Sequence, residues 1–176
     1  MKLQPGMTAL VTGAVSGLGE ASAIALLERG LNVVAVDLND ERGAAMEAKY
    51  PGRLRYVKAD VSDEAQMQAA VAAAEAFGNF RALVHCAGIG GPLRLVEKDG
   101  SAGSLEKFTN IIRVNQIGTF NTLRLAAASM ARNEPIDGER GACVLTASVA
   151  GYEGQIGQLP YASSKAGVIG MTIVAA

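Results

Sequence analysis

Short apolar runs alternate with stretches of helical spacing along this chain. The runs are almost continuously apolar, as in strands that helices cover on both faces. They predict strands at residues 8–12, 31–38, 53–57, 82–86 and 142–147. Strands that alternate with helices in this way form a parallel sheet with right-handed crossovers. The pattern therefore predicts an α/β fold, a three-layer, doubly wound parallel sheet of the Rossmann type, formed by residues 1–176 as a single domain.

Three of the intervening stretches repeat apolar residues at intervals of three and four, which predicts helices with one buried face. Before the second of them, Ser62-Asp63-Glu64 provides an N-cap and acidic residues for the first turn. The expected buried faces are Leu18, Ala21, Ile24 and Ala25 in the first helix; Met67, Ala70, Val71, Ala74 and Phe77 in the second; and Phe108, Ile111, Ile112, Asn115, Thr119, Thr122 and Leu123 in the third.

The end of the chain does not show the usual signs of a completed domain. The helix that begins near Tyr161 has no glycine, proline or basic last turn before Ala176. The late strands of a two-half Rossmann sheet are missing as well. We therefore expect a chain truncated at its C-terminus. Residues 89–104, which are rich in glycine and charge, are expected to form a surface insertion.

A glycine-rich turn, residues 12–19, follows the first strand and opens a helix. Gly13 and Gly17 can adopt backbone angles that other residues resist, and Gly19 lets the helix approach the sheet. The free N–H groups and positive dipole end of such a helix suit a pyrophosphate. We therefore predict a dinucleotide site that includes Gly13, Ser16, Gly17, Leu18 and Gly19. The alternative is a tight turn that binds no ligand.

Asp37 ends the second strand, eighteen residues after Gly19. A carboxylate at this position can accept hydrogen bonds from both hydroxyls of an adenosine ribose, and it would repel a 2′-phosphate. This favours NAD over NADP as the cofactor. The alternative is an acid that caps the next helix, a role for which Asn39 and Asp40 compete.

Two more pairs of residues are expected near the cofactor. Asp60 and Val61 follow the third strand and could reach the edge and the face of the adenine, although Asp60 could equally be a helix cap. Ala87 and Gly88 follow the fourth strand, at the same edge of the sheet. Their small side chains would let the cofactor pass close to the backbone.

A second group of residues can move a proton. Tyr161 and Lys165 are four residues apart, so they share a helix face, and Ser148 lies thirteen residues before the tyrosine. A neighbouring ammonium and a positive nicotinamide favour the phenolate, while a serine hydroxyl can hold the substrate oxygen. Asn115, on an apolar helix face, could order a water that relays protons from Lys165, or it could fix a helix kink. The alternative for the Tyr–Lys pair is a surface contact.

Charge and cysteine content exclude several classes. Lys and Arg number 16 against 17 Asp and Glu, without a long run of one sign, which argues against nucleic acid or an anionic membrane as partner. No stretch reads as a signal peptide or a membrane span. Cys86 and Cys143 stand in strand-like runs, so buried free thiols in the cytoplasm are expected. Metal-ligand spacing is absent, and His85 is the single histidine, so no metal site is expected.

The chain resembles the short-chain dehydrogenase/reductase family over essentially its whole length. The resemblance implies a catalytic tetrad of Asn115, Ser148, Tyr161 and Lys165, with Lys165 also in contact with the nicotinamide ribose. It further implies an NAD(P)(H) cofactor, a small-molecule substrate, and a homodimer or homotetramer built on the long helices that carry Asn115 and Tyr161. The matching residues are Thr12-Gly13-x-x-x-Gly17-x-Gly19, Asp37, Asp60, Ala87-Gly88, Asn115, Ser148 and Tyr161-x-x-x-Lys165.

Within that family, the chain is similar to the type-2 3-hydroxyacyl-CoA dehydrogenase branch. The implied reaction is the oxidation of a secondary alcohol, a 3-hydroxyacyl-CoA, to a 3-ketoacyl-CoA in fatty acid metabolism, with NAD as hydride acceptor and Tyr161 as general base. Gln155 would lie beside the substrate, with Ser148 and Tyr161. A 3-ketoacyl reductase, a hydroxysteroid dehydrogenase and a catalytically silent NAD-binding subunit or fragment are the alternatives. The similarity rests on residues 11–19, 118–121, 133–135, 147–150 and 154–158, and on the charged insertion at 97–104.

The chain departs from the family pattern in three places. His85 stands where the family usually has Asn, and it is interpreted as a satisfied buried imidazole. Leu159-Pro160 precedes Tyr161 where small residues are usual, and proline is tolerated in the first turn of a helix. The C-terminal part that completes the sheet and covers the substrate in this family is expected to be missing.

Overall fold

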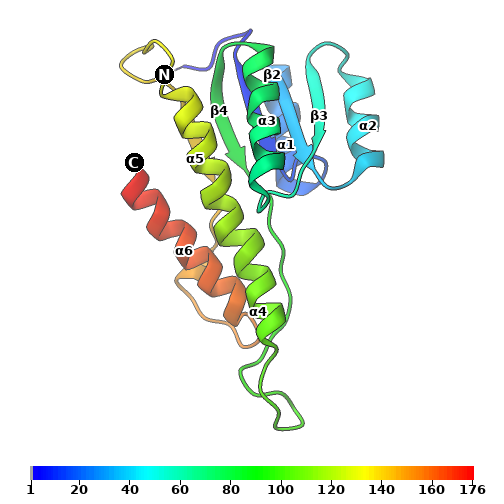
Figure 1. Ribbon diagram of the computed structural model, residues 1–176, viewed down its shortest axis with the longest axis vertical. Helices are drawn as coiled ribbons and strands as arrows, with labels where there is room; N and C mark the ends of the chain where they lie inside the picture. The colour runs from blue at the N-terminus through cyan, green and yellow to red at the C-terminus, as the bar shows by residue number, and fades with distance from the viewer. Residues whose placement is uncertain (1) are drawn as a thin grey trace.

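Five parallel strands form one sheet in the order β3-β2-β1-β4-β5. The computed structural model describes residues 2–176, and Figure 1 shows the sheet between helices. The chain runs from β1 outward to β3 and then returns to the other side of β1 at β4. The order of the strands therefore reverses beside β1, where ligands bind in open α/β sheets. The strands are β1 (Thr8–Thr12), β2 (Asn32–Asp37), β3 (Leu54–Lys58), β4 (Phe80–His85) and β5 (Ala142–Leu145).

The helices cover both faces of the sheet (Figure 1). Residues of α1 and α2 pack on one face, and residues of α3 and α5 pack on the other. Helix α6 packs against α4 and against the turn that follows α4. Within residues 2–176, no helix combines the length and the apolarity required to cross a bilayer. The helices are α1 (Gly17–Glu28), α2 (Asp40–Lys49), α3 (Glu64–Phe77), α4 (Leu105–Ile112), α5 (Gly118–Met130) and α6 (Leu159–Ala175).

The predicted doubly wound fold is confirmed, and so are the five strands within a few residues. The buried face of α3 is the predicted one, with Met67, Ala70, Val71 and Ala74 in the core. The predicted cap is also present, because the side chain of Asp63 accepts a hydrogen bond from the backbone N–H of Gln66.

The predicted buried face of α1 is only partly correct. Ile24 and Ala25 are partly buried, but Leu18 is 69% exposed and Ala21 is exposed. The buried residues of the helix are Gly19, Ala23, Leu26 and Leu27. The cause is the close approach of Gly19 to the turn before the helix. That contact rotates the glycine side of the helix toward the sheet and turns Leu18 outward.

Strand β5 is not covered on both faces, contrary to its apolar pattern. It lies at the edge of the sheet, and Ala142, Cys143 and Val144 are all exposed. The expectation of a buried thiol is therefore wrong for Cys143. Cys86 is partly buried, and both cysteines are free thiols, as predicted.

Helix α4 continues into α5 through a π-helical turn, Arg113–Ile117, instead of forming one regular helix. Asn115 lies at the centre of this turn and is completely buried. The hydroxyl of Thr119 donates a hydrogen bond of 2.5 Å to the carbonyl oxygen of Asn115. Single π-helical turns of this kind occur frequently at functional sites.

The segment between β4 and α4 extends away from the sheet as a long loop (Figure 1). Isolated bridges join Val96 to Ala102 within the loop and Leu93 to Gln158 across to the start of α6. The side chain of Ser104 then caps α4 through the backbone N–H of Lys107. The predicted surface insertion is therefore present, but residues 89–92 at its start belong to the site described next.

Candidate active site

A cleft of about 1180 Å³ lies at the carboxyl ends of the strands. Its walls come from the turns after β1, β2, β3 and β4, and from the beginning of α6. Every residue predicted to bind the cofactor lines this one cleft: Gly13, Ser16, Gly17, Leu18, Gly19, Asp37, Asp60, Val61, Ala87, Gly88, Tyr161 and Lys165.

The glycine-rich turn is packed too closely for side chains at two positions. A Cβ atom at Gly19 would lie 2.0 Å from the carbonyl oxygen of Gly13. A Cβ atom at Gly13 would lie 2.9 Å from the backbone nitrogen of Ala87. Gly13 and Gly17 also have φ angles of 62° and 50°, in the left-handed region that favours glycine. Because these glycines carry no side chains, the first N–H groups of α1 are accessible from the cleft, an arrangement that suits a pyrophosphate.

Asp37 faces this turn from the end of β2. Its Oδ1 accepts hydrogen bonds from the backbone N–H groups of Leu38 and Asn39, at 2.8 and 3.2 Å. Its Oδ2 accepts one from the N–H of Val15, at 3.3 Å. The cap of α2 is Asn39, whose side chain accepts from the N–H of Arg42. Asp37 is therefore not needed as a cap, and its carboxylate remains at the wall of the cleft.

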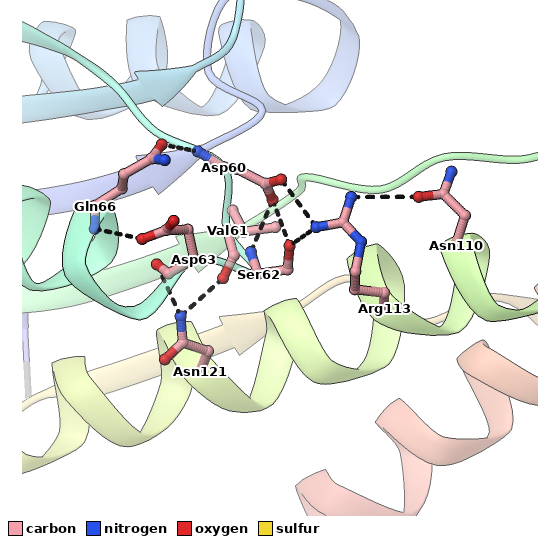
Figure 2. Close-up of polar contacts among 8 residues, drawn as sticks. All are labelled: Asp60, Val61, Ser62, Asp63, Gln66, Asn110, Arg113 and Asn121. Atoms are coloured by element: carbon pink, nitrogen blue, oxygen red, sulfur yellow. Dashed lines mark hydrogen bonds and ion pairs between the residues drawn. The ribbon is translucent and has the colours of Figure 1, made fainter.

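Asp60 lines the same cleft just after β3, the strand beside β2, and Figure 2 shows its contacts. Its Oδ1 accepts hydrogen bonds from the backbone and the hydroxyl of Ser62, and its Oδ2 pairs with Arg113 at 3.0 Å. Burial raises the pKa of Asp60, but the hydrogen bonds from Ser62 and the pairing with Arg113 outweigh it and leave the pKa below its ordinary value. Asp63 is the cap of α3, so the alternative of a capping role for Asp60 is not realised.

Tyr161 and Lys165 lie side by side in the first turns of α6. The Nζ atom of Lys165 is 5.7 Å from the centre of the Tyr161 ring and donates a hydrogen bond of 2.6 Å to the carbonyl oxygen of Thr146. Burial lowers the pKa of Lys165, and the neighbouring Cys86 opposes this shift. The pair faces the cleft, so the alternative of an ordinary surface contact does not describe it.

Asn115 does not line the cleft, but it supports the backbone that does. Its side-chain amide exchanges two hydrogen bonds of 2.8 Å with the N–H and carbonyl groups of Ile89, and it donates to the hydroxyl of Ser164 at 3.1 Å. A Cβ atom at Gly88 would lie 3.3 Å from Oδ1 of Asn115 and 3.7 Å from Nζ of Lys165. Asn115 and Lys165 therefore approach the same point behind Gly88.

Two further predicted residues stand outside the lining of the cleft. Ser148 follows β5, and its Oγ accepts a hydrogen bond of 3.2 Å from the N–H of Ala150, in a short 3₁₀ turn that packs on α6. Its hydroxyl hydrogen remains available to another acceptor. Gln155 is exposed, and it is the three residues after it, 156–158, that line the cleft.

Sequence reasoning missed several residues of the cleft wall. Arg113 and Val114 precede Asn115 and come to the cleft because the π-helical turn lies against the loop after β3. Residues 90–92, Gly-Gly-Pro, were assigned to a surface insertion, although they directly follow the predicted Ala87 and Gly88. Because these residues directly continue the predicted segment, their place in the cleft is predictable from the sequence.

His85 is buried at the end of β4, beside the end of β1. Its Nδ1 is 2.8 Å from the hydroxyl of Thr12, which also accepts a hydrogen bond from the N–H of Ala87. Its Nε2 has no hydrogen-bond partner among residues 2–176. The prediction of a satisfied buried imidazole is thus correct for only one of its nitrogens. Burial, followed by the charge of Lys165, lowers the pKa of His85 to about 3.

The lowered pKa of His85 predicts a loss of stability in acid. An unfolded histidine has a pKa of about 6.5. Between that value and about 3, the unfolded chain binds the extra proton, so the free energy of unfolding falls as the pH falls through this window. Relative to the variant His85→Asn, the wild-type protein should lose about 2 kcal/mol between pH 7 and pH 5. Urea denaturation at the two pH values measures this difference, and parallel pH dependences of the two proteins would contradict it.

The fold is that of a Rossmann-like α/β protein with a cleft suited to a dinucleotide, and comparison of sequences identifies its family. The family model of the short chain dehydrogenases matches residues 7–176. The chain therefore belongs to the short-chain dehydrogenase family. Membership implies a nicotinamide dinucleotide cofactor, NAD or NADP.

Curated relatives and a solved structure agree with this assignment. The 3-hydroxyacyl-CoA dehydrogenase type-2 of Bos taurus is 43% identical over 96% of this chain, and that of Drosophila melanogaster is 41% identical over 93%. A 2,5-dichloro-2,5-cyclohexadiene-1,4-diol dehydrogenase of Sphingobium indicum is 36% identical over 97%. The chain spans 66% of the length of each of these relatives. The crystal structure of 3-hydroxyacyl-CoA dehydrogenase type-2 from Mycobacterium avium is 47% identical, with a TM-score of 0.94 over 97% of this chain and 68% of that one.

Proposed function

We propose that this protein is an NAD-dependent oxidoreductase that oxidises a secondary alcohol, a 3-hydroxyacyl-CoA, to the corresponding ketone. The observation that carries the proposal is the position of Tyr161 and Lys165 in the same cleft as the glycine-rich turn and Asp37. The substrate class is supported by the relatives named as 3-hydroxyacyl-CoA dehydrogenases.

The residues of the cleft fit NAD. The turn has no room for side chains at Gly13 and Gly19, and Gly13 and Gly17 have positive φ angles, which leaves N–H groups for the pyrophosphate. Asp37 presents a carboxylate where the adenosine ribose would lie, which suits two hydroxyls and repels a 2′-phosphate. Asp60 and Val61 would contact the adenine. When bound, NAD supplies the hydride acceptor.

In the proposed reaction, Tyr161 would accept the hydroxyl proton of the substrate, and the bound NAD would be the acceptor of the hydride from the carbinol carbon. The hydroxyl of Ser148 donates a hydrogen bond to the substrate oxygen and holds it beside the phenol. The ammonium of Lys165 favours the phenolate and would help to hold the nicotinamide ribose. The lowered pKa of Lys165 eases the transfer of a proton onward, and Asn115 holds the backbone around that path. Gln155 would lie near the acyl end of the substrate.

We also propose that the protein is a homodimer or homotetramer formed through α4, α5 and α6. Three large apolar side chains on α4 and its continuation are exposed in the single chain, namely Leu105, Ile117 and Phe120. Ile117 and Phe120 lie on neighbouring turns, and Leu105 begins α4. Exposed apolar side chains on one helical segment are typical of surfaces that another protein covers.

Absorbance at 340 nm tests the proposed function directly. The protein is expected to form NADH when it is given NAD and a short-chain 3-hydroxyacyl-CoA, and to be much slower with NADP. If the protein turns over a hydroxysteroid faster than the 3-hydroxyacyl-CoA, the proposed substrate class is wrong and hydroxysteroids take its place. Binding of NAD without turnover of any secondary alcohol would contradict the enzyme and favour a catalytically silent NAD-binding protein.

A further inference from the structure

Arg113 connects the loop after β3 to the helix that carries Asn115 (Figure 2). It is the first residue of the π-helical turn, and it lines the cleft beside Asp60. Its Nη1 pairs with Oδ2 of Asp60 at 3.0 Å and also donates to the hydroxyl of Ser62. Its Nη2 donates to Oδ1 of Asn110 at 3.2 Å. Both ends of the guanidinium fork are thus held, which fixes its plane at the wall of the cleft.

Two buried contacts fasten the same loop to the same helix. The side chain of Asn121 donates hydrogen bonds to the carbonyl oxygens of Val61 and Asp63, at 2.9 and 3.3 Å (Figure 2). A Cβ atom at Gly118 would lie 2.6 Å from Cγ2 of Val61. These contacts fix the backbone of the loop. Arg113 differs from Asn121 and Gly118 because it fixes a side chain, the carboxylate of Asp60.

The contacts of Asp60 leave it ready to accept a further hydrogen bond. Ser62 occupies Oδ1, Arg113 occupies one side of Oδ2, and the backbone N–H of Asp60 is taken by Gln66. An ionised carboxylate offers about four acceptor positions, and two bonds from Ser62 and one from Arg113 leave one for a ligand in the cleft that Asp60 lines. Because its neighbours hold it from two sides, the carboxylate cannot rotate freely.

We propose that Arg113 is a positioning residue for the adenine end of the cofactor, and that it holds the Asp60 carboxylate in the orientation that accepts a hydrogen bond from the 6-amino group. This inference rests on the proposed NAD site and adds a residue to it. In this role, Arg113 determines the selectivity of the site for adenine without itself contacting the 6-amino group. A 6-oxo group in the same place would meet a carboxylate oxygen and be repelled.

The competing explanation is an ordinary surface ion pair, since the side chains of Arg113 and Asp60 are 46% and 28% exposed. Such a pair would affect stability only, and by a small amount. The chain offers a matched control in Arg124, which pairs with Glu64 at 2.8 Å and donates to Asn121 at 2.9 Å, so it contacts an anchor of the same loop without contacting Asp60. Arg124 does not line the cleft. A role in adenine selectivity should therefore belong to Arg113 and not to Arg124.

The test is the binding of NAD and of its hypoxanthine analogue, nicotinamide hypoxanthine dinucleotide, measured by titration calorimetry. The variants are Arg113→Ala, Asp60→Asn and the double substitution, with Arg124→Ala as the control. Arg113→Lys keeps the charge but cannot bridge Asp60 and Asn110 at once. Thermal unfolding of each variant verifies that it is folded.

The wild-type protein is expected to prefer NAD over the hypoxanthine analogue by about tenfold or more. Arg113→Ala should reduce this preference about three- to fivefold, Arg113→Lys should reduce it less, and Arg124→Ala should leave it unchanged. In the Asp60→Asn background, Arg113→Ala should have no further effect on the preference, because the residue through which it acts is gone.

Three results would overturn the inference while leaving the proposed function in place. They are an unchanged preference in Arg113→Ala, tighter binding of NAD by Arg113→Ala, and an equal effect of that substitution with and without Asp60. Tighter binding would mean that Arg113 competes with adenine for the carboxylate. A wild-type protein that binds neither dinucleotide would instead overturn the proposed function, and this inference with it.

Discussion

Tyr161→Phe is expected to lower the turnover number by about 10²–10⁴-fold, the usual contribution of a positioned proton-transfer group. The substitution removes only the hydroxyl, so the ring can remain beside Lys165, and the affinity for NAD should change by less than about twofold. The turnover number comes from NADH formation with a short-chain 3-hydroxyacyl-CoA, and the affinity comes from calorimetric titration of NAD. The combination of lost turnover and retained binding is the distinctive result.

Tyr152→Phe provides the matched control for this experiment. Tyr152 ends the 3₁₀ turn before α6, is 78% exposed and does not line the cleft. It should retain full turnover. A Tyr161→Phe variant that turns over at the rate of Tyr152→Phe would remove Tyr161 from the proposed reaction, whatever the protein's affinity for NAD.

Gly19→Ala is expected to damage both folding and cofactor binding. The added Cβ atom would lie 2.0 Å from the carbonyl oxygen and 2.6 Å from the carbonyl carbon of Gly13, so α1 must move away from the turn. Overpacking of this kind typically costs about 1–3 kcal/mol of stability. Because the turn and the first N–H groups of α1 move with the helix, the affinity for NAD should fall at least about tenfold. Urea denaturation and calorimetric titration measure the two effects.

Gly170→Ala controls for the loss of a glycine as such. Gly170 also lies in a helix, α6, but a Cβ atom there would meet no atom within 4 Å. This substitution should leave NAD binding unchanged and should stabilise the protein by about 0.5–1 kcal/mol, because alanine loses less backbone freedom on folding. If Gly19→Ala proved as harmless as Gly170→Ala, the close approach of α1 to the turn would not matter for the site.

The sequence was sufficient to predict the residues whose positions follow from the strands. Gly13, Asp37, Asp60 and Gly88 each come directly after a strand or within a few residues of its end, and parallel strands bring their carboxyl ends to one edge. Tyr161 and Lys165 were predictable for a similar reason, because a helix places residues four apart on one face. These predictions needed only the period of each element and the direction of the sheet.

Other features depend on contacts between distant segments of the chain. The spacing of apolar residues within one helix or strand does not predict such contacts. The rotation of α1 follows from the contact of Gly19 with Gly13, which overrode the apolar spacing that included Leu18. The exposure of β5 follows from its place at the edge of the sheet, which its apolar composition did not reveal. The pairing of Arg113 with Asp60 joins residues that are 53 positions apart and depends on the π-helical turn.

The π-helical turn also determines where the chain can change in length. An α-helix rotates by about 100° for each residue, so deleting one residue from the turn would swing α5 around its axis relative to α4. Gly118 and Asn121 would then leave the loop at Val61, and the spacing between Arg113 and those anchors would be lost. By contrast, the loop between Leu93 and Ser104 projects away from the sheet and can take up added or missing residues at little cost. Insertions and deletions in natural variants should accumulate in that loop and be excluded from Arg113–Ile117.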